Sequence, residues 1–414
     1  MKMMTALALI LASASAAHAA GSLTNESFID QVGTKNNATI SQQNGSNSQG
    51  TFQTGKNNSV LTSQISNLPT GKNNAGNVQV GKDNTASTIQ TNNAPNPLFT
   101  TATYTNNSLS SQFGTKNDAT IGQVGGQNNQ STVQAGQKNE SLVTQSNSAV
   151  TSASALPVGG GNTSFTGQFG TKNTAATSQT TADATDDFGG FEQGHGNAAT
   201  SLQFGKNNEI ATRQNASGGI AQGTNNAATT VQYGNGNLAG TTQGGSVSGA
   251  FGATTADQTA NYTNASFLSQ AGTQNVGRVD QANGANTSAL FQVGTKNLAS
   301  VTQATQTFGT GGGANNAVTS QVGTKNKATI GQSIADPLAL GNNNSFATQI
   351  GGNNVVNSAQ VTGQQASAGN NTQVSMQVGV GNSITVAQAT GANVANTSFT
   401  AQFGSHNTAI VSQK

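Results

Sequence analysis

The sequence contains no cysteine and no tryptophan, and only 7% of its residues are charged. Without cysteine, the chain has no disulfide, no thiolate nucleophile and no cysteine-ligated metal. The apolar fraction of 33% is too low to fill a large conventional hydrophobic core. A formal net charge of +2 over 414 residues gives no electrostatic footprint for nucleic acid or anionic lipid. This composition argues against an ordinary enzyme and against a nucleic-acid-binding protein.

Side chains suited to catalysis are also scarce. His195 and His406 occupy positions expected to be turns, in or near the slot that lysine usually fills. The only adjacent carboxylates, Asp186 and Asp187, lie in an irregular stretch, where a solvated loop is the simpler interpretation. The two glycine triplets lack the following Lys-Ser/Thr of a phosphate loop. We therefore predict no catalytic residue, no cofactor and no metal site.

Long apolar runs are confined to the N-terminus. Lys2 is followed by an apolar run at residues 3–12 and then by Ala17-His18-Ala19. This order is typical of a secretory signal with a small-x-small cleavage site, so we interpret residues 1–19 as a cleaved signal peptide. No later segment approaches the ~20 apolar residues that a transmembrane helix needs. The mature chain, residues 20–414, is expected to be exported, with no membrane span.

What the sequence has in abundance is a short repeat built on amide side chains. Gln112, Gln123, Gln134 and Gln145 are spaced eleven apart, and an asparagine stands six residues before each of them. Between each Asn and its Gln, small and apolar residues occupy alternate positions. Spacing by two is the signature of a β-strand, in which alternate residues share a face.

Each repeat therefore predicts one strand and one turn. In the copy that ends at Gln123, the residues Asn117, Ala119 and Ile121 share its face, and the intervening residues point the other way. The preceding segment, residues 113–116, contains Gly and Lys and is expected to form the turn. Units this small must stack on neighbours to bury a face. Two units per coil predict an all-β fold, a β-solenoid of about 22 residues per coil with cross-β, amyloid-like stacking, in which each strand lies over the second strand after it.

This arrangement explains the amides. A buried amide without a partner costs about 1–3 kcal/mol, but identical amides stacked one layer apart can bond to each other. We therefore expect Asn and Gln to form ladders along the solenoid axis. The predicted ladder residues are Gln31, Asn36, Gln42, Gln112, Asn117, Gln123, Asn128, Gln134, Asn139, Gln145, Gln292, Asn297, Gln303, Gln321, Asn326, Gln332, Gln402, Asn407 and Gln413.

Irregular stretches interrupt the repeat, and we interpret them as loops that leave the solenoid and not as domain linkers. They include residues 91–105, 146–161, 180–190 and 305–313. If all of the mature chain were coiled at the ~4.8 Å spacing of strands, one molecule would be on the order of 85 Å long.

Two sets of side chains, lysines and phenylalanines, are expected to face outward, and each set has two possible roles. Lysines are expected directly before the strand asparagine; they would either keep the turns soluble or form a positive edge for acidic polysaccharide. These lysines are Lys35, Lys56, Lys116, Lys138, Lys172, Lys206, Lys296 and Lys325. Phenylalanines before the turn glycine would serve either packing on the outer face or contacts between fibrils. They are Phe113, Phe169, Phe204 and Phe403.

The repeat resembles a known family. Its consensus, Ser-x-x-x-Gln-x-Gly-x-x-Asn-x-Ala-x-x-x-Gln, is similar to the curlin repeat of secreted bacterial amyloid subunits. It stands as SFIDQVGTKNNATISQ at residues 27–42, and as SLSSQFGTKNDATIGQ, SFTGQFGTKNTAATSQ and SFTAQFGSHNTAIVSQ at residues 108–123, 164–179 and 398–413. The resemblance implies export through an outer-membrane pore, a nucleator subunit as partner, and growth into curli fibres of the biofilm matrix. The chain is several times longer than a five-repeat curlin, so main subunit, nucleator and elongated relative stay open.

Three functions remain to be distinguished. The leading hypothesis is an extracellular structural protein that polymerises with itself, because the last unit, AQFGSHNTAIVSQK, carries nothing like a cap and an uncapped stack is a template for the next molecule. The alternative is a monomeric β-solenoid that acts as an adhesin or binds a ligand at the cell surface. A third possibility is a disordered low-complexity chain.

Overall fold

The computed structural model describes residues 25–67, 71–92, 105–148, 161–182, 196–217, 225–246, 263–305, 313–334, 341–363, 369–390 and 394–414. The predicted signal peptide lies outside these ranges, as do His195, Asp186, Asp187 and all five prolines.

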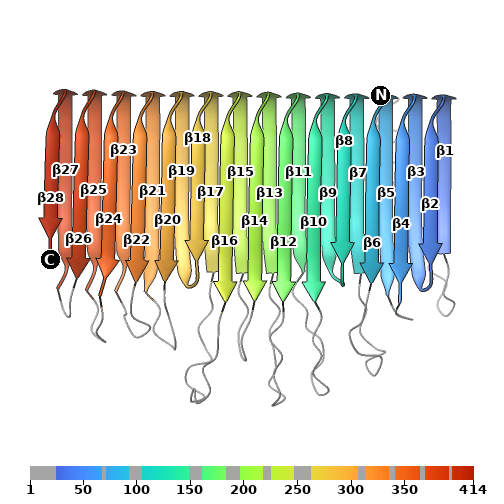
Figure 1. Cartoon of the computed structure of the whole chain (residues 1–414), viewed down its shortest axis with the longest axis horizontal. Coiled ribbons are helices and arrows are strands. Elements are labelled where there is room, and N and C mark those ends of the chain that lie inside the picture. Colours follow the sequence, from blue (N-terminus) through green and yellow to red (C-terminus); the bar gives the residue numbers. More distant parts are fainter. Residues whose placement is uncertain are drawn as a thin grey trace, which may run out of the picture.

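The described residues form two parallel sheets of fourteen strands each, stacked face to face (Figure 1). One sheet holds the odd-numbered strands and is called the odd sheet below. Its members are β1 (Asn25–Thr34), β3 (Ser46–Lys56), β5 (Lys72–Lys82), β7 (Thr105–Thr115), β9 (Asn128–Gln137), β11 (Asn162–Thr171), β13 (Gly196–Lys206), β15 (Asn225–Asn235), β17 (Thr263–Thr273), β19 (Ala285–Thr295), β21 (Ala314–Thr324), β23 (Asn343–Gly352), β25 (Asn371–Val380) and β27 (Asn396–Ser405).

The second sheet, called the even sheet, holds the remaining strands. They are β2 (Asn37–Gln43), β4 (Ser59–Ser66), β6 (Thr85–Asn92), β8 (Asp118–Val124), β10 (Glu140–Ser148), β12 (Thr174–Ala182), β14 (Glu209–Ser217), β16 (Leu238–Ser246), β18 (Val276–Ala282), β20 (Leu298–Thr305), β22 (Lys327–Ile334), β24 (Val355–Thr362), β26 (Ser383–Thr390) and β28 (Thr408–Gln413).

Each strand pairs in parallel with the second strand after it, so the chain coils as a β-solenoid with two strands per turn. β1 lies at one end of the stack and β28 at the other (Figure 1). The sequence-based prediction of an all-β solenoid with this connectivity is confirmed. Within the described residues, no helix is long and apolar enough to cross a membrane.

Side chains alternate between the space between the sheets and the outside. In β8, Ala119, Ile121 and Gln123 are buried, while Asp118 and Thr120 point outward. Small, hydroxyl-bearing and apolar residues fill most of the middle of the core, together with a few buried amides such as Asn77, Gln130 and Gln373. Glutamine and asparagine close the core at both edges.

One edge of the solenoid is constant. From the glutamine of each odd strand to that of the next even strand the interval is eleven residues in every coil, for example from Gln112 to Gln123. The expected four-residue turn at residues 113–116 is shorter in the structure, because Phe113, Gly114 and Thr115 belong to β7 and only Lys116 and Asn117 leave the strand. Gly114 has a φ of 115° and Lys116 a φ of 57°, and these two conformations turn the chain from one sheet to the other.

The opposite edge is variable. From even strand to odd strand, the interval between glutamines ranges from eleven residues, between Gln42 and Gln53, to 27 residues, between Gln243 and Gln270. Residues inserted at this edge add no rung to the sheets. The expected length of 85 Å is therefore wrong: fourteen strands at a spacing of ~4.8 Å give a stack about 67 Å long.

Candidate functional site

Glutamines form one continuous ladder in each sheet. In the odd sheet, the side-chain Nε2 of each ladder glutamine donates to the Oε1 of the next at 2.5–3.1 Å. In the even sheet, the same bonds measure 2.7–2.9 Å. The odd ladder includes the predicted Gln31, Gln112, Gln134, Gln292, Gln321 and Gln402, and the even ladder includes Gln42, Gln123, Gln145, Gln303, Gln332 and Gln413.

The same glutamines also tie the two sheets together. Gln134 of β9 donates to the backbone carbonyl of Asp118 in β8 at 2.7 Å, and Gln145 of β10 donates to the carbonyl of Asn129 in β9 at 3.0 Å. In the coils between the two ends, each glutamine amide nitrogen thus serves one bond along the axis and one bond across the core. A hydrophobic side chain at these positions could make neither bond, which explains why glutamine recurs here.

A third ladder lies at the constant edge and consists of the asparagine that follows each corner. Its backbone N–H donates to the side-chain Oδ1 of the preceding coil's asparagine at 3.0–3.2 Å. Its Nδ2 donates to the carbonyl of the corner glycine in the following coil, as Asn117 does to Gly136 at 3.2 Å. The predicted residues in this ladder are Asn36, Asn117, Asn139, Asn297, Asn326 and Asn407.

A fourth ladder runs along the variable edge, at or near the start of the odd strands, and the predicted Asn128 belongs to it. Asn128 donates through Nδ2 to Asn106 at 3.0 Å and accepts from Asn162 at 3.0 Å. Sequence reasoning treated all ladder asparagines alike and missed this division. The signal was present: only the corner asparagines always follow a glycine by three residues, as Asn117 follows Gly114.

The ladders have a direction. In the bonds between ladder side chains, glutamine amides donate toward the C-terminal coil, whereas the inward asparagine amides donate to asparagines of the N-terminal coil. At the N-terminal end, Gln31 and Gln42 therefore have no ladder donor to their Oε1 among the described residues, and at the C-terminal end, Gln402 and Gln413 have no ladder acceptor beyond them. The strands β1, β2, β27 and β28 likewise have one neighbour each among the described residues.

Exposure marks the same two ends. Ile29 of β1 is 45% exposed, although Leu290, in the same inward row, is fully buried. Gln31 and Asn407 are exposed, unlike their counterparts in the interior coils. Each end therefore presents amides, apolar side chains and backbone groups shaped like the next coil.

Other chemistry is sparse in the described part of the chain. His406 lies exposed at a corner with a φ of 58°, as expected for a turn residue. No group of three or more metal-ligating side chains occurs within these residues. The lysines lie along the constant edge, but two of them were placed one position wrongly: Lys56 and Lys206 end β3 and β13, and Asn57 and Asn207 separate them from the ladder asparagines.

Comparison with known proteins adds no family. No protein-family model matches the chain, and no curated protein is similar to it.

Proposed function

We propose that this protein is a secreted structural protein that joins end to end with copies of itself into extracellular fibres. The observation that carries the proposal is the pair of complementary ends. A second copy placed in the same orientation offers Gln402 and Gln413 to the open Oε1 atoms of Gln31 and Gln42. The same placement pairs the edge backbone of β27 with β1 and that of β28 with β2, as within the molecule.

Polarity makes this addition specific. Because each ladder donates in one direction only, a copy added in the reverse orientation would set glutamine donor against donor and asparagine acceptor against acceptor at one end. The fibre is therefore polar, and each molecule adds about 67 Å of length.

The resemblance to curlin repeats supports the finer part of the proposal. The repeat quoted above from residues 108–123 supplies a Gln112 and a Gln123 that stack in the two sheets. On this basis we propose a curli-like fibre of the biofilm matrix, involved in surface adhesion, with a nucleator subunit and an outer-membrane pore as partners.

The test uses the mature chain, residues 20–414, and a variant that blocks one end. Val411 of β28 points inward against the core and is only partly buried, because β28 has no later strand among the described residues. A lysine there would be tolerated in the monomer but would become a buried charge once another copy docked. Ser412→Lys places the same charge on the exposed outer face of β28 and serves as the matched control.

We expect the wild type and Ser412→Lys to form dye-positive fibres at micromolar concentration, and Val411→Lys to form no fibres while keeping an unchanged β-sheet circular dichroism spectrum. Dye fluorescence and sedimentation report the difference. Fibres of Val411→Lys at the wild-type rate would rule out growth through this end. A wild-type chain that stays monomeric for days would instead favour the monomeric adhesin.

A further inference from the structure

The two outer faces of the solenoid differ in chemistry. Every aromatic side chain of the described residues lies on the outer face of the odd sheet, in three registered rows that begin at Phe28, Asp30 and Val32 and end at Phe399, Ala401 and Phe403. These three rows are called the aromatic face. Sequence intervals between successive members vary from coil to coil, so only the stacking of strands brings them together.

Within the row that begins at Val32, the aromatic rings stack on one another. The ring centroids of Phe169 and Phe204 are 5.0 Å apart, and those of Phe204 and Tyr233 are 4.8 Å apart with nearly parallel planes. The row remains apolar beyond this stack, with Val293 50% exposed and Ile350 44% exposed. A stripe of exposed apolar side chains thus runs along the stack.

Charge separates this face from the opposite one. Asp30 is the only charged residue in the three rows of the aromatic face, and it lies on the terminal strand β1. The outer face of the even sheet carries acidic and basic side chains along much of its length, among them Asp118, Glu140, Arg213 and Arg278. The aromatic face is therefore the one that gains from leaving water.

We propose that the aromatic face is a docking surface for the same face of a second copy, so that two solenoids pair side by side. Three rows of side chains across fourteen strands cover roughly 1,400 Å² per copy, from a strand spacing of ~4.8 Å and a row spacing of ~7 Å. The pair would bury about 2,800 Å², which exceeds the ~1,600 Å² of a standard stable interface. The largest apolar patch on a typical monomer is only about 300–600 Å².

Periodicity identifies a second copy as the occupant. The side chains of the aromatic face repeat at the strand spacing over the whole length of the stack. A partner that contacts all fourteen strands at equivalent positions needs the same ~4.8 Å repeat. Another copy of this chain has that repeat, and it meets the face with an equally uncharged surface.

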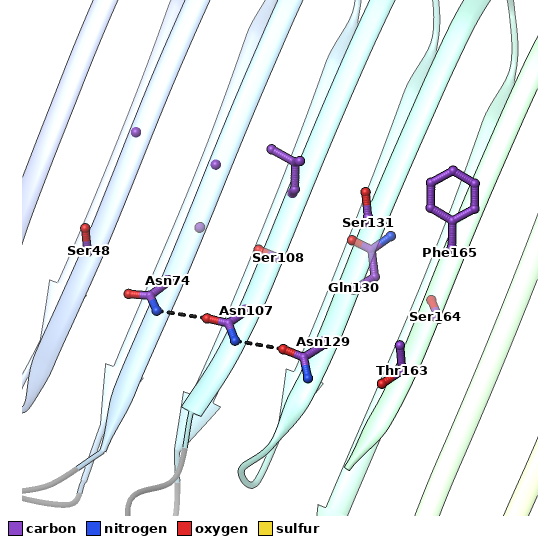
Figure 2. A pocket seen from close by; sticks show the side chains of 14 residues that line it. Ser48, Asn74, Asn107, Ser108, Asn129, Gln130, Ser131, Thr163, Ser164 and Phe165 are labelled. Atoms are coloured by element: carbon purple, nitrogen blue, oxygen red, sulfur yellow. Dashed lines mark hydrogen bonds between the residues drawn. The ribbon is translucent and has the colours of Figure 1, made fainter. Parts of the chain in front are cut away.

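The aromatic face also has a hollow into which a side chain of the second copy can fit. The row that begins at Phe28 continues through Gly50 and Gly76, and from Gly50 to Phe165 it lines a hollow of about 440 Å³ that Leu109 also borders. A Cβ added at Gly50 would meet no heavy atom within 4 Å. Figure 2 shows this hollow beside the outward row of Asn74, Asn107 and Asn129, which bond to one another at 2.8 and 2.7 Å. Asn107 is bonded on both sides, so its amide stays hydrogen-bonded when an aromatic ring enters the hollow.

The pairing is separate from end-to-end growth, which uses the first and last strands. The test is therefore made on a triple variant that leaves the ends intact: Phe204→Glu, Val293→Glu and Ile350→Glu. These outward positions lie on β13, β19 and β23, so no two glutamates are adjacent in the ladder. The control variant Leu61→Glu, Leu142→Glu and Leu298→Glu makes the same change of charge on the even sheet, where all three leucines are exposed.

We expect wild-type fibres to contain two solenoids with their odd sheets facing each other, and hence twice the mass per unit length of a single filament. The triple variant should elongate as single filaments, which halves the mass per unit length, and the control variant should stay paired. Scanning transmission electron microscopy gives the mass, and cryo-EM cross-sections show which sheets face each other.

Three results would overturn the proposal: single wild-type filaments, pairing that survives in the triple variant, or pairing through the even sheet. Binding of single wild-type filaments to neutral phosphatidylcholine vesicles would assign the face to lipid instead. If no fibres form, the proposed fibre function fails, but pairing is still measured as a monomer–dimer equilibrium by sedimentation of the wild type against both triple variants.

Discussion

At the scale of single residues, the amide side chain is what makes this core possible. Glutamine and asparagine can donate and accept at once, so each copy satisfies the one before it and the one after it. Gln123 shows the arrangement, since it accepts from Gln90, donates to Gln145 and also donates to the carbonyl of Asn107. A carboxylate in this place could only accept, and a leucine could do neither.

Removing one rung tests this account. Gln134→Leu leaves the Oε1 of Gln168 and the carbonyl of Asp118 without their present donor, so we expect the free energy of unfolding to fall by about 2–5 kcal/mol. The measurement is urea unfolding in the Val411→Lys background, which is expected to form no fibres. Ser131→Ala, an outward change on the same strand, should cost less than about 0.5 kcal/mol. Equal losses in the two variants would mean that the ladder contributes nothing special.

One carboxylate should give the stability a pH dependence. Partial burial between neighbouring strands, and secondly the adjacent Glu140 carboxylate, raise the pKa of Asp118 above its ordinary value of 3.8. The folded state therefore binds the proton more tightly than the unfolded state, and this group adds stability as the pH falls through the raised pKa. At neutral pH the charged carboxylate costs stability.

Asp118→Asn mimics the protonated form at every pH. We expect it to be more stable than the parent at pH 7, and this advantage to vanish below pH 3.8, where Asp118 is neutral in both states. Urea unfolding midpoints of the two proteins between pH 3 and pH 7 measure the difference. An advantage that grows as the pH falls would show that the sign is wrong.

At the scale of elements, the constant corner limits what can end an odd strand. The corner glycines stack directly on one another, with φ values between 102° and 133°. A Cβ built on Gly136 would lie 1.9 Å from the carbonyl oxygen of Gly170 in the next coil. The same carbonyl accepts from the corner asparagine Asn139 at 3.2 Å, so a shift of the backbone would also break the asparagine ladder.

Two glycine substitutions therefore have opposite expected outcomes. Gly136→Ala combines a backbone clash with a strained φ of 127°, and we expect it to destabilise the fold by more than about 3 kcal/mol. Gly122→Ala in β8 meets nothing within 4 Å and should be neutral or stabilising by up to about 1 kcal/mol. Thermal unfolding of both variants in the Val411→Lys background decides the matter, and a tolerated Gly136→Ala would refute the corner geometry.

At the scale of the whole molecule, the unit of construction is one full coil. Deleting residues 118–139 removes one strand from each sheet and joins Asn117 to Glu140, which is the same junction that Asn139 makes now. All four ladders then close across the gap. We expect this variant to fold and to shorten the rise per molecule in its fibres by ~4.8 Å.

Deleting half a coil should fail. Removal of residues 118–128 moves every later strand into the other sheet, which places the variable intervals at the edge where the glycine corner must form. Circular dichroism and cryo-EM distinguish the two deletions. Two equally stable products would show that the sheets and edges are interchangeable.

The sequence alone determined which residues form strands and how those strands stack. Period-two alternation and the regular spacing of Asn and Gln were enough to predict the solenoid and the strand order that the structure confirms, because each of these features acts between residues of one strand or of adjacent coils.

Only the tertiary structure shows the features in which the two sheets, or the two edges of the solenoid, differ from each other. It showed that all variable intervals lie on one edge, which corrected the expected length, and that corner asparagines bond differently from Asn128. It also gathered the aromatic rings of Phe169, Phe204 and Tyr233 on one outer face. These relations join residues separated by intervals that change from coil to coil, so no fixed period in the sequence could reveal them.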